Sequence, residues 1–185
     1  MIYPDWITLK LTMFTVGVLL VITHGLALVN RKGVGEWLRA FPRSRPAGVL
    51  LTGIAALWFY FMVKLMDLGE FSSWRNAVLL FTPVAAVLAI FYMGEFLAVR
   101  AAGTIVLLLA EPLLESAFLR DEQARLLLVV LVYVWIVAAL FWVGMPYTLR
   151  NQIAWVSASE TRWRYAAFAG IAYGALLCVG GLLVR

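Results

Sequence analysis

The chain has 185 residues, of which 64% are hydrophobic and only 14% are charged, and its formal net charge at pH 7 is +5. A soluble domain of this size cannot bury so much apolar surface in one core, and a disordered chain would be far less hydrophobic. The single cysteine, Cys178, excludes a disulfide-stabilised scaffold. The composition therefore predicts an integral membrane protein.

Six apolar segments approach the length of about 20 residues that a membrane-spanning helix needs. In chain order they are 11–30, 47–66, 77–98, 101–119, 126–147 and 165–184. The connections between them are short, so consecutive helices must pack against one another. We expect an all-α integral membrane protein, a compact bundle of about six transmembrane helices that forms a single domain over residues 1–185.

The first segment contains His24, the only histidine. We interpret it as a neutral imidazole that hydrogen-bonds across helices. The alternative is an axial haem ligand or a quinone-binding group, although a methionine or a partner chain would have to supply the second haem ligand. No metal site is predicted, because Cys178 and His24 fall near opposite sides of the membrane. Apart from the haem or quinone alternative, no cofactor is predicted.

Two connections contain signals for further helical structure. The connection 31–46 carries five basic residues and two prolines, and a short surface helix over 35–41 fits it. In the connection 150–164, Ser157 is followed three residues later by Glu160, the pattern of a capping box. This pattern predicts that the last helix begins near Ser157.

Glu95 and Arg100 frame the junction between the third and fourth segments, where only a few residues separate two apolar runs. They are five residues apart, so they cannot pair directly on one continuous helix. We interpret them as a charge cluster at the inner interface, with the Arg100 side chain reaching the lipid headgroups. The alternative is that Glu95 contacts another helix inside the bundle.

The fourth segment carries two carboxylates, Glu111 and Glu115, on one helix face. Glu111 lies ten residues after the start of the segment, about 15 Å along a helix, which is near mid-membrane. Pro112 follows it directly and predicts a kink or break in the helix. One interpretation is a proton or cation site on a broken helix, since intramembrane carboxylates usually face a cavity or a relay.

Two other interpretations of these carboxylates stay open. In one, the helix is shorter or tilted, both acids lie near the outer interface, and Arg120 or Arg125 pairs with them. In the other, the segment 101–119 is re-entrant and does not cross the membrane. A re-entrant segment would invert the fifth helix and place the basic residues of 150–164 outside, which the distribution of basic charge disfavours.

The last segment contains small residues at every fourth position: Ala166, Gly170, Gly174 and Cys178. A stripe of this kind lets another helix approach closely. We expect it to serve packing within the bundle, with self-association as the alternative.

The distribution of basic residues predicts the orientation in the membrane. With the N-terminus outside, nine lie near the cytoplasmic ends of the helices: Arg31, Lys32, Arg39, Arg43, Arg45, Arg100, Arg150, Arg162 and Arg164. Six lie near the outer ends: Lys10, Lys64, Arg75, Arg120, Arg125 and Arg185. Lysine and arginine favour the cytoplasmic side. We therefore expect both termini outside, in a bacterial inner membrane. The excess basic charge then faces anionic lipid and needs no nucleic acid.

The sequence contains no Gly-rich phosphate loop, no HExxH metalloprotease motif, no nucleophile elbow and no CxxC. The first hypothesis is therefore a non-catalytic subunit or scaffold of a larger membrane complex, in contact with lipid and with other membrane subunits or a second copy. The alternative is a small transporter or proton/ion pathway that uses the intramembrane carboxylates. The third hypothesis is an intramembrane haem- or quinone-binding protein that uses His24.

Overall fold

The computed structural model describes residues 8–184, and every regular element in this range is helical. Six helices are long and apolar enough to cross a membrane. They are α1 (Leu9–Val29), α3 (Arg45–Leu65), α4 (Arg75–Tyr92), α5 (Leu97–Ala117), α6 (Arg125–Gly144) and α8 (Glu160–Leu183). The shorter elements are α2 (Arg31–Ala40), η1 (Phe41–Arg43), η2 (Gly69–Trp74), which precedes α4, and α7 (Tyr147–Ser157). The structure thus confirms an all-helical chain with six helices of membrane-spanning length and hydropathy.

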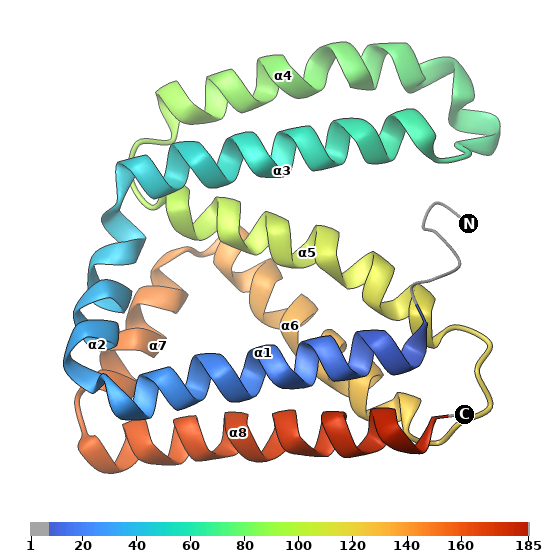
Figure 1. The fold of residues 1–185 in the computed structure, drawn as a ribbon. Helices are drawn as coiled ribbons and strands as arrows, with labels where there is room; N and C mark the ends of the chain where they lie inside the picture. The colour runs from blue at the N-terminus through green and yellow to red at the C-terminus, as the bar shows by residue number, and fades with distance from the viewer. Residues whose placement is uncertain (1–7, 185) are drawn as a thin grey trace.

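The long helices other than α6 run between the same two ends of the molecule, whereas α6 is inclined and stops short of one of them (Figure 1). The helices α2 and α7 lie across one of these ends, and α1 begins and α8 ends at the other (Figure 1). Both connections rich in basic residues therefore lie at a single end, opposite the start of α1 and the end of α8.

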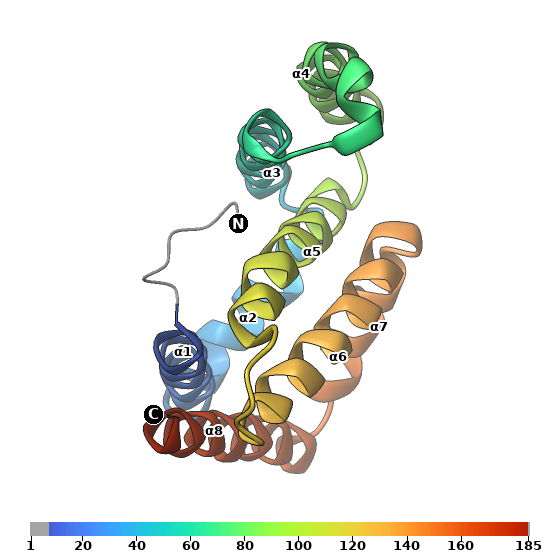
Figure 2. The same ribbon diagram turned by 90° about the vertical axis from the view of Figure 1, so that its right-hand side faces the viewer.

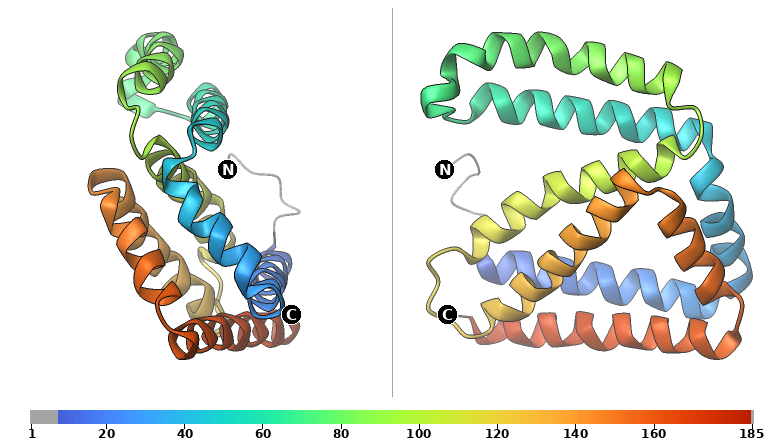
Figure 3. Two further views of the ribbon diagram at one scale, coloured as in Figure 1. Left: turned by 90° about the vertical axis from the view of Figure 1, so that its left-hand side faces the viewer. Right: turned by 180° about the vertical axis from the view of Figure 1, so that it is seen from behind.

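The helices form an elongated stack of pairs, which differs from the compact bundle predicted from the sequence. The pair α1–α8, the pair α5–α6 and the pair α3–α4 follow one another, with α4 outermost (Figure 2). Seen from behind, α5 lies between α1 and α3 (Figure 3). The physical reason is α2, which runs along the end of the stack and places the start of α3 away from the end of α1.

Two boundaries at the junction of the third and fourth segments differ from the sequence-based prediction. The third long helix ends at Tyr92 and the fourth begins at Leu97, so Arg100 lies in the first turn of α5 and not in the junction. The chain turns through 93–96, where Phe96 has a left-handed backbone (φ 59°). Hydropathy does not detect this turn because apolar residues flank it on both sides.

The prediction of a helix start at Ser157 is wrong. Ser157 is the last residue of α7, and Ser159 is the N-cap of α8, whose first residue is Glu160. The residues 147–157, which the hydropathy pattern assigned to the end of a span and a polar loop, form α7. The surface helix predicted over 35–41 begins earlier, at Arg31, where the Asn30 side chain accepts a hydrogen bond from the backbone N–H of Gly33.

The predicted break at Pro112 is absent from the described helix. The helix α5 continues from Leu97 to Ala117 with Pro112 inside it, and it runs from one end of the stack to the other (Figure 1). This course disagrees with the re-entrant interpretation. Around Pro112, the α5 residues Ala110 and Leu113 belong to a buried cluster with α1 and α6, and this packing supports the helix across the missing backbone donor.

The α1–α8 pair is held by close backbone approach. A Cβ atom added to Gly17 on α1 would lie 2.6 Å from the Gly174 carbonyl oxygen and 2.6 Å from the Cys178 Sγ on α8. Gly170, one turn from Gly174, contacts the His24 ring on α1. The four-residue stripe of α8 therefore lies against α1. In a bilayer, burying apolar side chains between helices gives no hydrophobic free energy, because lipid chains are equally apolar. Close packing of this kind is then a main source of helix association.

Side-chain hydrogen bonds connect the same helices. The Trp163 Nε1–H on α8 donates to the Ala27 carbonyl oxygen on α1, at 2.8 Å. The Tyr173 hydroxyl on α8 donates to the Leu127 carbonyl oxygen on α6, also at 2.8 Å. A cluster of buried apolar side chains from α1, α5, α6 and α8 completes the core, and it includes Met13, Leu113, Leu128, Val132 and Leu177.

We expect Gly17→Ala to destabilise the protein by about 1–3 kcal/mol, because the added methyl group meets backbone atoms of α8 and forces the two helices apart. The matched control is Gly25→Ala on the same helix, where an added Cβ meets nothing within 4 Å. Thermal unfolding of both variants in detergent measures the difference. Equal unfolding temperatures for the two variants would contradict the close α1–α8 contact.

The charge distribution predicts that the end carrying α2 and α7 is cytoplasmic. Cysteines introduced in a Cys178→Ala background at Ser44 and Ser159 should resist an impermeant thiol reagent in intact cells. A cysteine at Ser73, in η2 at the opposite end, should react. The reverse labelling pattern would show that the orientation is inverted.

Candidate functional site

A groove of about 830 Å³ lies between α3, α4 and α5. The helix α3 packs against both α4 and α5 and forms the floor, while α4 and α5 form the two walls (Figure 2). Its lining runs from Trp74, before the first residue of α4, to Met93, after the last. The groove therefore follows a helix about 27 Å long, close to the thickness of the hydrocarbon core.

Small side chains line much of this groove. Seven alanines contribute to it: Ala55, Ala56, Ala77, Ala85, Ala86, Ala89 and Ala101. On α4, Ala77, Ala85 and Ala89 are spaced by multiples of four residues, so they share one helix face. This face turns toward the groove. Small residues at such spacing allow the backbone of a neighbouring helix to come close. The face of α4 that a packing helix would use is thus open.

Three threonines place hydroxyl groups along the apolar groove. The Thr82 Oγ1 donates to the Val78 carbonyl oxygen at 2.8 Å, and the Thr104 Oγ1 donates to the Arg100 carbonyl oxygen at 3.0 Å. The Thr52 Oγ1 on α3 is buried and has no hydrogen-bond partner within residues 8–184. A buried hydroxyl without a partner costs about 1–3 kcal/mol, so Thr52 is a source of instability in the floor of the groove.

Arg100 lies at the end of the groove near the turn 93–96. Its Nη1 donates to the Val143 carbonyl oxygen at 2.7 Å, near the C-terminal end of α6, where helix carbonyls lack partners of their own. Glu95 lies exposed in the turn itself. Of the polar residues singled out from the sequence, Arg100 alone lines the groove.

Glu111 and Glu115 are half-buried on α5 and line neither wall of the groove in the described part of the chain. Because α5 ends at Ala117, Glu111 lies six residues, or about 9 Å, from the end of the helix, and four residues beyond its middle. The Arg125 Nη1 donates to the Ala117 carbonyl oxygen at 3.4 Å, and Ala117 is two residues beyond Glu115. The structure thus places a cation near this end of α5.

His24 lies on α1 beside a small, mostly apolar cavity of about 320 Å³ that Trp37 and Trp163 also line. Its Nδ1 is 2.9 Å from the Leu20 carbonyl oxygen in the same helix, and because a carbonyl only accepts, Nδ1 carries the proton in this contact. Contact with α8 is by packing of the ring against Gly170.

The structure does not bring the sequence-predicted polar residues together. His24, Glu95 and Glu111 lie on different elements or at different ends of the stack. No group of three or more His, Cys, Asp or Glu side chains with the geometry of a metal site occurs among residues 8–184. Sequence reasoning missed Thr52 and the alanine face of α4, although the four-residue spacing of alanines on α4 was a signal of the same kind as the stripe on α8.

No known protein family matches the chain, and neither a characterised protein nor a solved structure is detectably similar to it.

We expect Thr52→Val to raise the unfolding temperature of the isolated protein, because it removes a buried hydroxyl that has no partner in the described chain while keeping the β-branched shape. Thr82→Val is the matched control in the same groove, since its hydroxyl is bonded to its own helix and its loss should give no gain. Thermal unfolding in detergent distinguishes the two. An equal rise for both variants would show that hydrophobicity, and not the unpartnered hydroxyl, sets the effect.

Proposed function

We propose that the protein is a non-catalytic subunit of a bacterial inner-membrane complex and that the α3–α4–α5 groove receives one transmembrane helix of another subunit. The observation that carries this proposal is the alanine-lined groove, as long as a membrane-spanning helix, with the buried Thr52 hydroxyl in its floor. The six apolar helices and the basic end of the stack support an orientation with both termini outside.

A helix suits the groove better than lipid does. Lipid chains offer no partner for the Thr52 hydroxyl, whereas a serine, threonine or asparagine on a neighbouring helix offers one once the Thr52 side chain rotates toward the groove. Alanine faces give dense contacts with another helix, while flexible chains fit them poorly. The outer position of α4, which packs mainly against α3, leaves this wall accessible from the membrane.

Photo-crosslinking tests this proposal in native membranes. A photoreactive amino acid at Ala85, inside the groove, should give a discrete protein adduct whose cross-linked peptide belongs to a transmembrane segment of another protein. The same probe at Leu88, which is exposed on α4 outside the groove, should label lipid. An adduct of twice the mass of the chain would identify a second copy and contradict a distinct partner. Lipid labelling at both positions would contradict a docking groove.

Filling the groove should weaken assembly. We expect Ala85→Phe to reduce association with the cross-linked partner about tenfold or more, because overpacking a helix contact costs roughly 1–3 kcal/mol. The isolated protein should keep its unfolding temperature, since the groove has room for the ring. The control is Val84→Phe on the outer side of α4. Co-purification yield and affinity measured in detergent report the change, and equal losses for both variants would contradict the assigned face.

A further inference from the structure

A second cavity, of about 540 Å³, lies at the basic end of the stack, where α1 ends and α2 and α8 begin. Its lining carries three cationic side chains and includes Asn30, Arg31, Lys32, Arg39, Ser157 and Trp163. The α3–α4–α5 groove shares none of these residues. The two sites therefore rest on different observations.

The α2 side of the cavity concentrates cationic side chains. Arg31, Lys32 and Arg39 occupy positions on one side of this ten-residue helix, so like charges face the same space. No acidic side chain lies within ion-pair distance of Lys32 or Arg39 in the described part of the chain. Such a group of cations is stabilised when an anion enters between them.

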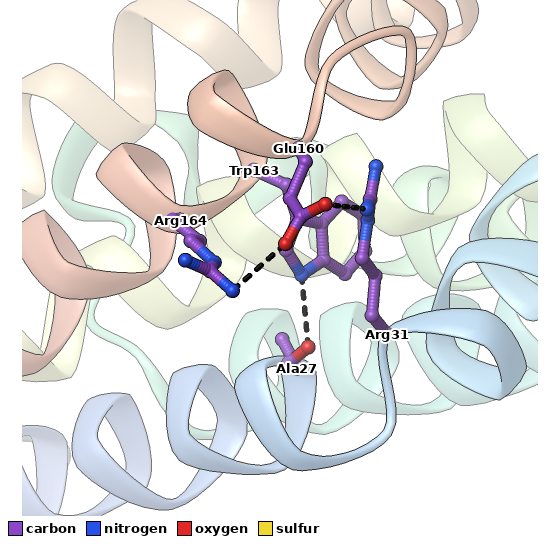
Figure 4. Close-up of polar contacts among 5 residues, drawn as sticks. All are labelled: Ala27, Arg31, Glu160, Trp163 and Arg164. Atoms are coloured by element: carbon purple, nitrogen blue, oxygen red, sulfur yellow. Dashed lines mark hydrogen bonds and ion pairs between the residues drawn. The ribbon is translucent and has the colours of Figure 1, made fainter.

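One carboxylate lies beside the cavity, and two arginines share it (Figure 4). The Glu160 Oε2 is 3.3 Å from the Arg31 Nη1, and its Oε1 is 2.8 Å from the Arg164 Nη2. Because Glu160 already neutralises part of two guanidinium groups, the cavity keeps a net positive charge from Lys32 and Arg39. Glu160 also holds Arg31 in place at the entrance to α2.

The remaining walls supply a hydrogen-bond donor and a rigid surface. The Ser157 Oγ at the end of α7 is buried and has no hydrogen-bond partner within residues 8–184. The Trp163 ring is fixed by the bond from its Nε1 to the Ala27 carbonyl oxygen (Figure 4). Two cations without an ion-pair partner in the described part of the chain, together with a rigid wall, suit the acceptor oxygens of a phosphate group.

Gly35 keeps this space open. A Cβ added there would lie 3.8 Å from the Trp163 ring, in ordinary contact, so only a side chain longer than alanine would project into the cavity. This position allows the cavity to be filled without changing any charge.

We propose that the cavity binds the phosphate group of an anionic ligand, with Lys32 and Arg39 as its contacts. A phospholipid headgroup and a soluble phosphate ester share this chemistry. Of these two ligands, the position of the cavity favours the phospholipid headgroup. The cavity lies where α1 ends and α8 begins, at the level of the membrane interface. Basic pockets at this level recognise anionic headgroups.

Native mass spectrometry of the delipidated full-length protein in an uncharged detergent tests the proposal. Wild type should bind one phosphatidylglycerol per chain and prefer it to phosphatidylcholine. Lys32→Gln/Arg39→Gln should weaken this binding about 30-fold, since each interfacial cation contributes about fivefold. The matched control, Arg43→Gln/Arg45→Gln, removes two exposed cations at the same end but outside the cavity, and it should change binding less than about twofold.

The cavity-filling variant Gly35→Leu keeps every charge and should abolish phosphatidylglycerol binding. It tests the proposal independently, even where Lys32→Gln/Arg39→Gln folds poorly. Gel filtration and circular dichroism check folding. Competition with inorganic phosphate in millimolar excess distinguishes a lipid headgroup from a soluble phosphate ester. If the protein retains phosphatidylglycerol, the site binds a headgroup. If it binds phosphate and shows no preference for phosphatidylglycerol, the site binds a soluble ester. Equal losses in the two double variants, or unchanged binding by Gly35→Leu, would overturn the proposal.

Discussion

The contact between Gly17 and Gly174 is the constraint on which the arrangement of the chain depends. It joins the first and last long helices along their length and so fixes both at one edge of the stack. Because lipid gives no hydrophobic force between helices, this edge is held by close backbone packing and by the bond from Trp163 to α1. The end of α1 and the start of α8 then define where α2 and α7 must lie.

From this edge, α2 determines the rest of the architecture. It carries the chain across the end of the stack, so α3 starts beyond α5 and the α3–α4 pair becomes an outer layer (Figure 3). One consequence is the open alanine-lined groove, since α4 has α3 as its main neighbour. A second is the cationic cavity, whose basic side is α2 itself. Both proposed sites thus follow from one ten-residue helix that is too short to cross a membrane.

Hydropathy was sufficient to predict the six long helices, because a bilayer selects for apolar length regardless of tertiary contacts. Hydropathy was insufficient where backbone conformation sets a helix boundary. At Phe96, a left-handed conformation separates α4 from α5 inside an apolar run. Thr52 is an ordinary span residue in the sequence, and only packing shows that its hydroxyl is buried without a partner. The compact bundle was expected because short loops suggest adjacent helices, while α2 is long enough to separate them.

Under the proposed function, the outer position of α4 would link the abundance of this protein to that of its partner. A helix with so few contacts of its own contributes little to the stability of the isolated chain, so a bound helix in the groove would stabilise the folded state by mass action. Chains made in excess over the proposed partner would keep the alanine-lined groove open, a feature by which membrane proteases can distinguish orphan subunits from assembled ones. Stoichiometry in the cell would then be set by degradation as well as by synthesis.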